Sequence, residues 1–185
     1  MALFVGGFHC NNASALKVIA TEYWPAGRVV VEVNMTTHVQ SIDELRTLVG
    51  SPLGESPYHT VTQEEVNLFA DATGDHQWIH VDPVKAKSGP FGQTIAHGYF
   101  TLSIIPILLR DVIQVDGVAM GLNYGVNKVR FTSPVPIGSE VRATATVAAC
   151  EEIEGGAQLT LDVIVSIKDA PKPSCVAQVV YRYYR

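Results

Sequence analysis

The sequence is poor in cysteine, in charged residues and in long apolar runs, and each shortage excludes a class of protein. Its three cysteines, Cys10, Cys150 and Cys175, are too few and too far apart for a disulfide framework or a thiolate metal site. We interpret them as buried, inert thiols and expect a cytoplasmic protein. The longest apolar run, residues 95–109, is short for a bilayer span and contains Pro106. We interpret it as a core helix and expect no membrane partner.

The acidic balance of the chain excludes another class of partner. A net charge of -5 and the absence of any Lys/Arg run argue against a nucleic-acid surface. With 47% hydrophobic and 17% charged residues among 185, the composition is that of one globular domain. The N-terminus, MALFVGGFHCNNAS, has no basic region ahead of its short apolar patch, so it makes a poor signal peptide.

Residues 1–34 differ from the rest of the chain. Their charges are sparse and their apolar residues keep no sustained period, although RVVVEV at 28–33 favours a short strand. We expect this segment to be an N-terminal appendage of unknown role: a leader, an added segment or the product of upstream translation. Residues 35–185 would then form the single domain.

Capping signals predict three helices before the long apolar run. Residues 41–50 begin with a Ser-x-x-Glu box and end at glycine. Thr62 and Glu65 form a second capping box, and Gly74 stands where a left-handed residue would end that helix. Residues 82–89 begin with Asp-Pro and end at glycine, which predicts a short third helix.

From residue 118 onward the pattern changes to period two, which is typical of strands. Turn residues separate four alternating segments, at 124–135, 139–152, 157–169 and 174–185. Consecutive strands with short links predict an antiparallel sheet, and the apolar segment 99–112 predicts a helix that the sheet wraps on several sides. Pro106 predicts a kink or break in that helix. The predicted fold class is α+β.

The clearest polar signal is GDHQWIH, residues 74–80, which puts Asp75 and His80 five residues apart. On one continuous helix these side chains would lie about 140° apart and would not easily converge. Because Gly74 ends one helix and Asp82 begins the next, the pair lies in a link. A link can curl so that both side chains point into one cavity.

Other interpretations of these polar residues stay open. Asp75 is a common turn residue that bonds backbone, and a metal site would need His76 and His80 on one helical face, with His97 downstream. The caps on both sides argue against such a face. His97 and Gly98 precede the apolar helix, whose first N–H groups suit a developing oxyanion. Alternatively, Gly98 lets the helix pack closely on the sheet, and His97 is a core histidine.

Together these segments resemble a known family. FADATGDHQWIHVDPVKA followed by GPFGQTIAHGYFTL is similar to the MaoC-like, hot-dog-fold (R)-specific enoyl-CoA hydratases, including the nodulation-protein-N-like group. That signature is an aromatic residue, a small stretch, then G-D-x-N-P-(aliphatic)-H, and a downstream A-H-G. The matching residues are Phe69, Gly74, Asp75, Ile79, His80 and Ala96 to Gly98. The likeness covers residues 42–185 and implies a hot-dog fold, an antiparallel sheet around a central helix with short overhanging helices.

The resemblance implies reversible hydration of a trans-2-enoyl-CoA to an (R)-3-hydroxyacyl-CoA, with no cofactor and no metal. Asp75 would take a proton from water. His80 would hold the same water and help manage the proton delivered to C2. The Gly98 N–H would bind the thioester oxygen. Because a carboxylate is a weak base in water, we expect the site to be apolar.

Two positions depart from the family pattern. Gln77 stands where the family has Asn, so it can still donate to a catalytic side chain or to water. Trp78 stands where the family has Pro, and with Tyr99 it would line the substrate pocket, which leaves the substrate length open. The resemblance also implies a homodimer and a CoA thioester whose phosphates need local cations. The candidates are Lys85, Lys87, Lys128 and Arg130.

Two further functions remain open. A hot-dog thioesterase would use the same fold, since that fold hosts both activities. The ordered set Asp75, His80 and Gly98 favours the hydratase over it. A non-catalytic acyl-CoA or acyl-carrier-protein binding module is suggested by the departures at 77–78.

Overall fold

The computed structural model describes residues 18–24, 27–33 and 36–185, with side chains described from residue 36 onward. Two strands, β1 (Val18–Trp24) and β2 (Gly27–Val33), pair antiparallel, which confirms the strand predicted at 28–33. Much of the predicted appendage, including Cys10, lies outside the described residues. The domain boundary after residue 34 therefore stays a prediction.

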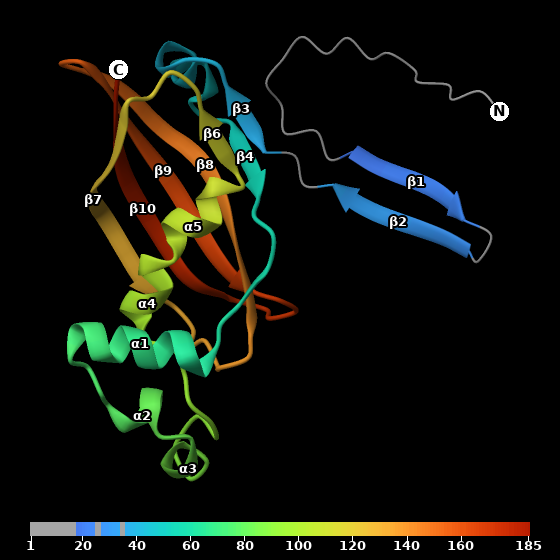
Figure 1. Cartoon of the computed structure of the whole chain (residues 1–185), viewed down its shortest axis with the longest axis vertical. Coiled ribbons are helices and arrows are strands. Elements are labelled where there is room, and N and C mark those ends of the chain that lie inside the picture. The colour runs from blue at the N-terminus through green and yellow to red at the C-terminus, as the bar shows by residue number, and fades with distance from the viewer. Residues whose placement is uncertain (1–17, 25–26, 34–35) are drawn as a thin grey trace.

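A curved antiparallel sheet is the main element of residues 36–185 (Figure 1). Its strands are ordered β4 (Pro52–Glu55), β8 (Glu140–Ile153), β9 (Gly156–Ile167), β10 (Pro173–Tyr184) and β7 (Met120–Phe131), with β5 (His59–Thr60) also paired to β8. The four strands predicted from the period-two pattern are confirmed. β8, β9 and β10 follow one another as hairpins, whereas β7 pairs with β10 and forms one edge of the sheet.

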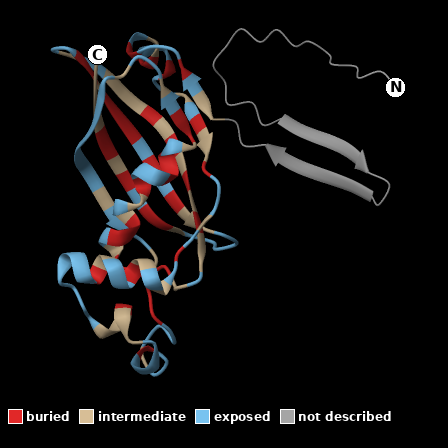
Figure 2. Cartoon of the chain, viewed as in Figure 1, coloured by how far each residue is buried: buried red, intermediate tan, exposed pale blue. Residues whose placement is uncertain are grey.

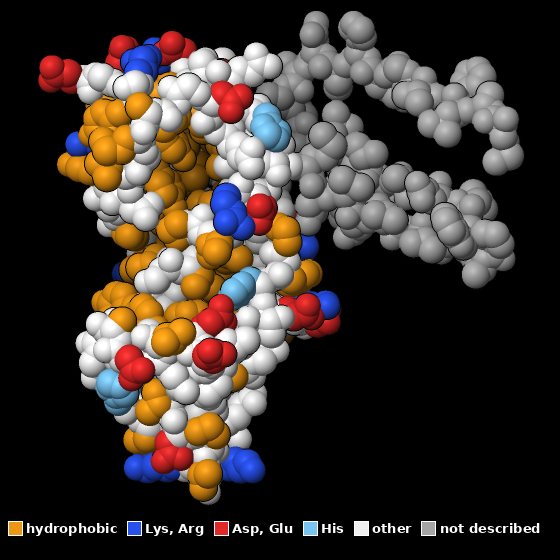
Figure 3. Space-filling model, in the orientation of Figure 1, with side chains coloured by type: hydrophobic (Ala, Val, Ile, Leu, Met, Phe, Trp, Pro, Cys, Tyr) orange, Lys and Arg blue, Asp and Glu red, His pale blue; other side chains and the backbone are white. Residues whose placement is uncertain are grey.

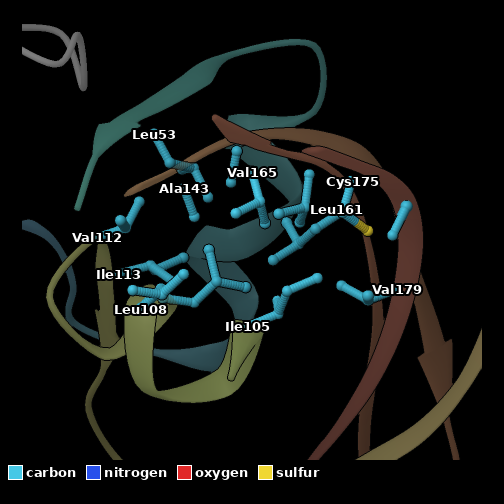
Figure 4. Packing of buried hydrophobic residues seen from close by; sticks show 14 of the residues in the cluster. Leu53, Ile105, Leu108, Val112, Ile113, Ala143, Leu161, Val165, Cys175 and Val179 are labelled. Carbon is cyan, nitrogen blue, oxygen red and sulfur yellow. The ribbon is translucent and has the colours of Figure 1, made fainter. Parts of the chain in front are cut away.

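The sheet wraps around two short helices in line, α4 (Gly98–Ser103) and α5 (Ile105–Arg110). They are separated at Ile104, two residues before Pro106, whose ring removes a backbone donor that a continuous helix needs. The predicted break is confirmed. Ile105 and Leu108 of α5 pack in the core shown in Figure 4. Alternate residues of β8 face the same core; they are Val141, Ala143, Ala145 and Val147.

This helical segment is covered on several sides, as predicted, but one side of it is open. Tyr99 is 69% exposed and Ile107 49% exposed. All residues of β7 except Val129 are exposed as well. Apolar side chains gather around β7 and beside α4 and α5 in Figure 3. An edge strand has one neighbour where an inner strand has two, so the chain alone leaves this side open.

Three short helices lie beyond one end of the sheet (Figure 1): α1 (Gln63–Thr73), α2 (Trp78–Val81) and α3 (Pro83–Ala86). The capping box of Thr62 and Glu65 begins α1, and Gly74 ends it with φ of 79°, as predicted. The Asp82 side chain caps α3 by accepting from the Lys85 N–H. The helical turn α2 was not predicted, and it places His80 in a helix rather than in a link.

The remaining elements are one short helix and a separate two-stranded sheet. The helix predicted at 41–50 is a 3₁₀ helix, η1 (Ile42–Leu48), capped by Ser41. β3 (Thr37–Val39) and β6 (Ile113–Val115) pair in parallel. Figure 2 shows the alternation of buried and exposed residues along the strands. Cys175 is buried as predicted, whereas Cys150 is only half-buried, so that prediction is wrong for Cys150. Among the described residues, every helix is too short or too polar to span a bilayer.

Candidate active site

Asp75, His80 and His97 come together next to the first turn of α4. One donor atom from each of them lies within 4.8 Å of the other two. Gly74 turns the chain out of α1 into the link that carries Asp75. His80 lies in α2, and His97 is the N-cap residue of α4. Three separate elements therefore supply one polar cluster.

The hydrogen bonds of His80 fix its neutral tautomer. Its Nδ1 lies 2.7 Å from the carbonyl oxygen of Ile95. A carbonyl oxygen only accepts, so Nδ1 carries the proton and Nε2 keeps a free lone pair. The side chain is buried, and burial is the main cause that lowers the pKa of His80 below 6.5, with the neighbouring His97 lowering it further. His80 is therefore a neutral acceptor near neutral pH.

His97 is the member of the cluster that the sequence left as either a core residue or a ligand. It is 3% exposed, and its ring stacks on that of His80 with centroids 3.8 Å apart. Its Nε2–H donates to the backbone oxygen of Asp75 at 2.9 Å. The other ring nitrogen, Nδ1, has no hydrogen-bond partner within residues 36–185. His97 thus packs against the ring of His80 and holds the backbone of Asp75 in place.

Asp75 is the exposed member of the cluster. Its carboxylate is 57% exposed, and Oδ2 lies 4.0 Å from His97 Nε2. Its Oδ1 accepts from the backbone N–H of Gln77 at 3.4 Å. The apolar enclosure expected around this carboxylate is therefore incomplete in the single chain.

Gly98 meets His80 at a cavity of about 260 Å³ between α4 and the segment that follows β7. The first N–H groups of a helix have no acceptor within it, so the N–H of Gly98 is free of its own helix. The close-packing interpretation also holds. A Cβ placed on Gly98 would lie 2.6 Å from the Phe131 ring, so only glycine lets α4 approach β7 this closely.

A second cavity, of about 290 Å³, lies farther along the same helices. It is lined by Leu102, Ser103, Ile105, Pro106, Asn123, Gly125, Val126, Val179, Val180 and Tyr181. Residues of α4, α5, β7 and β10 contribute to it, so both cavities border the same helix pair and β7.

Trp78 and Tyr99 do not line either of these two cavities. Trp78 packs over Gly89, where a Cβ would lie 2.8 Å from its ring, and the Lys85 ammonium sits 5.0 Å from the ring centroid. Tyr99 meets Phe131 edge to face. Gln77 is exposed and begins α2 without a side-chain cap.

The candidate phosphate-binding cations lie apart from the polar cluster in the fold. Lys85 and Lys87 lie in and just after α3, and Lys128 and Arg130 lie on β7. All four are exposed, and Arg130 donates to the carbonyl oxygen of Val129. Within residues 36–185, no shared hydrogen-bond or ion-pair partner joins them into one site.

The metal interpretation changes its ligands. His76 pairs with Asp71 at 2.9 Å and is not part of the cluster, which leaves Asp75, His80 and His97 of the predicted ligands. The two stacked imidazole rings differ by 30° in plane. A shared metal needs both nitrogen lone pairs aimed at one point, and stacked rings aim them side by side.

Comparison with known proteins identifies the family to which the chain belongs. A family model described as a MaoC like domain matches residues 44–167. The chain belongs to the MaoC-like family. 3-Hydroxyacyl-thioester dehydratase Z of Mycobacterium tuberculosis (strain ATCC 25618 / H37Rv) is 51% identical over 145 residues, which cover 78% of this chain and 96% of that protein. Nodulation protein N of Rhizobium leguminosarum bv. viciae is 41% identical over 144 residues, covering 76% and 89%.

The fold of the chain is also similar to that of solved hydratases. The solved (R)-hydratase from A. caviae, involved in PHA biosynthesis, matches with a TM-score of 0.59 and 25% identity, covering 72% of this chain and 94% of that one. The antiparallel sheet around central helices is a hot-dog fold, as predicted. Membership of the MaoC-like family supports a dehydratase or hydratase role.

Proposed function

We propose that this MaoC-like chain catalyses reversible hydration of a trans-2-enoyl-CoA to an (R)-3-hydroxyacyl-CoA. The observation that carries the proposal is the cluster of Asp75 with neutral His80, in which His80 lines a cavity that the first turn of α4 also borders. The names of the dehydratase and (R)-hydratase relatives support the same reaction class.

The two candidate residues divide the proton chemistry. Asp75 removes one proton from the water while the water oxygen bonds to C3. The electrons of the double bond then move toward the thioester oxygen. His80 Nε2 holds the water by accepting its second hydrogen, because Nδ1 already donates to Ile95. The enolate then collapses to the thioester as C2 takes the proton back from Asp75. One water is added and the carboxylate is regenerated.

The Gly98 N–H would stabilise the charge that develops on the thioester oxygen. A preorganised donor of this kind typically contributes about 3 kcal/mol to the transition state. The cavity near Ile105 and Val126 would hold the acyl chain, since it begins along the same helix pair and is lined mainly by apolar side chains. The CoA phosphates would meet one or more of the exposed cations on α3 and β7.

The open side of the chain supports a homodimer. β7 is an edge strand, and it exposes Leu122, Tyr124 and Val126. Exposed apolar side chains beside an unpaired strand edge suit a second copy that continues the sheet. We propose that the homodimer covers β7 and completes the enclosure of Asp75.

One assay separates this proposal from the two other functions. The protein is incubated with crotonyl-CoA while the enoyl absorbance and free thiol are followed together. Loss of absorbance without thiol supports hydration, thiol release supports a thioesterase, and neither signal over a series of chain lengths supports a binding module.

Two substitutions test the assigned roles. Asp75→Asn removes the carboxylate base and His80→Gln removes the imidazole, so each should abolish turnover while leaving the thermal unfolding curve in place. Asp71→Asn is the matched control, because Asp71 is an exposed carboxylate of α1 that pairs with His76 outside the cluster. Near-full activity in either test variant would refute the roles assigned here.

A further inference from the structure

His80 lies in α2, a helix that is too short to be stable without contacts to other segments. α2 has four residues, and the Asp82 N–H donates to the Trp78 carbonyl oxygen to close its single turn. One helical turn is unstable in water, because too few hydrogen bonds compensate the ordering of its backbone. The placement of His80 must therefore come from contacts outside α2.

Three hydrogen bonds supply those contacts. The Ile95 N–H donates to the Ile79 carbonyl oxygen at 3.0 Å, and His80 Nδ1–H donates to the Ile95 carbonyl oxygen at 2.7 Å. From the other side, Gln63 Nε2–H donates to the His80 carbonyl oxygen at 2.7 Å. Gln63 is the first residue of α1, so its side chain links α1 to α2.

The Gln63 side chain is itself held by Thr94. The hydroxyl of Thr94 is buried and donates to Gln63 Oε1 at 2.6 Å. Thr94 directly precedes Ile95, which accepts from the His80 ring. The backbone around Thr94 is fixed in turn, since its carbonyl oxygen accepts from Ile137 and the Ala96 N–H donates to Val135.

A closed ring of contacts results: Gln63 to His80, His80 to Ile95, Ile95 to Thr94 along the chain, and Thr94 to Gln63. We infer that Gln63 and Thr94 are positioning residues, which hold the His80 imidazole so that Nε2 faces the reacting water. This inference rests on the proposed hydration for its kinetic consequence, but not for its effect on His80 itself.

The variants are chosen to remove the ring's polar atoms and little else. Gln63→Met keeps the length and helix propensity of the side chain without its amide. Thr94→Val keeps the branched shape without the hydroxyl, and Thr94→Ser restores the hydroxyl. Asn67→Ala is the control, because Asn67 accepts from the same Gln63 amide at 2.9 Å but lies on the exposed face of α1.

Kinetics with enoyl-CoA give the first readout. A lost hydrogen bond and a shift of about 1 Å at a reacting group together lower kcat by about 10- to 100-fold. We expect that loss in Gln63→Met and in Thr94→Val, with KM changed less than about threefold, because neither residue lines the two cavities. Thr94→Ser and Asn67→Ala should stay within about twofold of the unaltered chain.

An NMR titration of the His80 ring gives the second readout, which a general loss of stability would not move. A loosened ring gains water, so its midpoint should rise toward 6.5 in Gln63→Met. The titratable groups facing this ring are His97 and Asp75, and no test variant changes them.

Unaltered kcat and titration in both Gln63→Met and Thr94→Val overturn the inference, as does an equal loss in Asn67→Ala. If the unaltered chain hydrates no enoyl-CoA, the proposed function fails, and the His80 titration alone then decides: a raised midpoint supports the positioning role and an unchanged one refutes it.

Discussion

The close contact between α4 and β7 makes Gly98→Ala an informative substitution. The added Cβ would lie 2.6, 2.8 and 2.9 Å from three atoms of the Phe131 ring. Carbon atoms pack at about 3.5–4.0 Å, so the ring or the helix must retreat by roughly 1 Å. Overpacking of this kind costs about 1–3 kcal/mol, and alanine returns up to about 1 kcal/mol of helix propensity.

The expected net loss of stability is therefore up to about 3 kcal/mol, which lowers Tm by up to about 12 °C in a chain of this size. The backbone N–H proposed to bind the thioester oxygen survives the substitution but moves with the helix. A displacement of about 1 Å should lower kcat about 100-fold. Thermal unfolding and the crotonyl-CoA assay measure the two effects separately.

Two further variants decide whether the contact is the cause. Combining Gly98→Ala with Phe131→Leu removes the ring and should recover most of kcat. Gly125→Ala on β7 is the control for Tm alone, because a Cβ there meets no atom within 4 Å, whereas the residue lines the cavity proposed for the acyl chain. An unchanged Tm and kcat in Gly98→Ala would refute the packing argument, and a loss of kcat that Phe131→Leu fails to relieve would refute the assigned cause.

Three other predictions concern His80, the sheet edge and the N-terminal segment. Because burial lowers the pKa of His80, the folded chain releases its proton at a pH where the unfolded chain still binds it. The stability that this group contributes is fully present above pH 6.5 and is lost as the pH falls through the folded-state pKa. Urea titrations at several pH values should show that His80→Gln weakens this pH dependence of the unfolding free energy. An unchanged pH dependence in His80→Gln contradicts the prediction. Leu122→Lys on β7 should convert the proposed dimer to monomer in light scattering, whereas Ile164→Lys on the inner strand β9 should not; a dimeric Leu122→Lys chain argues against this interface. A chain lacking residues 1–34 should fold and keep its kcat, and an unfolded or inactive product would show that the segment belongs to the domain.

Local chemistry made much of the fold predictable. The capping box of Thr62 and Glu65 and the left-handed Gly74 fix α1 through contacts within a few residues, so the sequence alone locates both ends. The strands β8, β9 and β10 were visible because one face of each is buried, and Pro106 marks the helix break by its missing donor. Asp75 and His80 were selected by their spacing and by the family resemblance, but the link predicted to carry both holds Asp75 alone, since His80 lies in α2.

The rest depended on contacts between distant segments. His97 donates to the backbone oxygen of Asp75, 22 residues away, and stacks on His80. The residues next to His97 in the sequence give no sign of either contact. The turn α2 was missed because tertiary hydrogen bonds, rather than its own residues, hold it. The open side at Ile107 was missed because an apolar residue has the same pattern whether it meets its own sheet or a partner.

The packing of Trp78 over Gly89 has a consequence for how related sequences can diverge. With the indole in place, any side chain at position 89 collides with it at 2.8 Å. A mutation at 89 is then tolerated only in a background where position 78 has already become smaller. The two positions should therefore covary among relatives, with large residues at 78 accompanied by glycine at 89. The order of substitutions, and not only their identity, would decide which sequences remain folded.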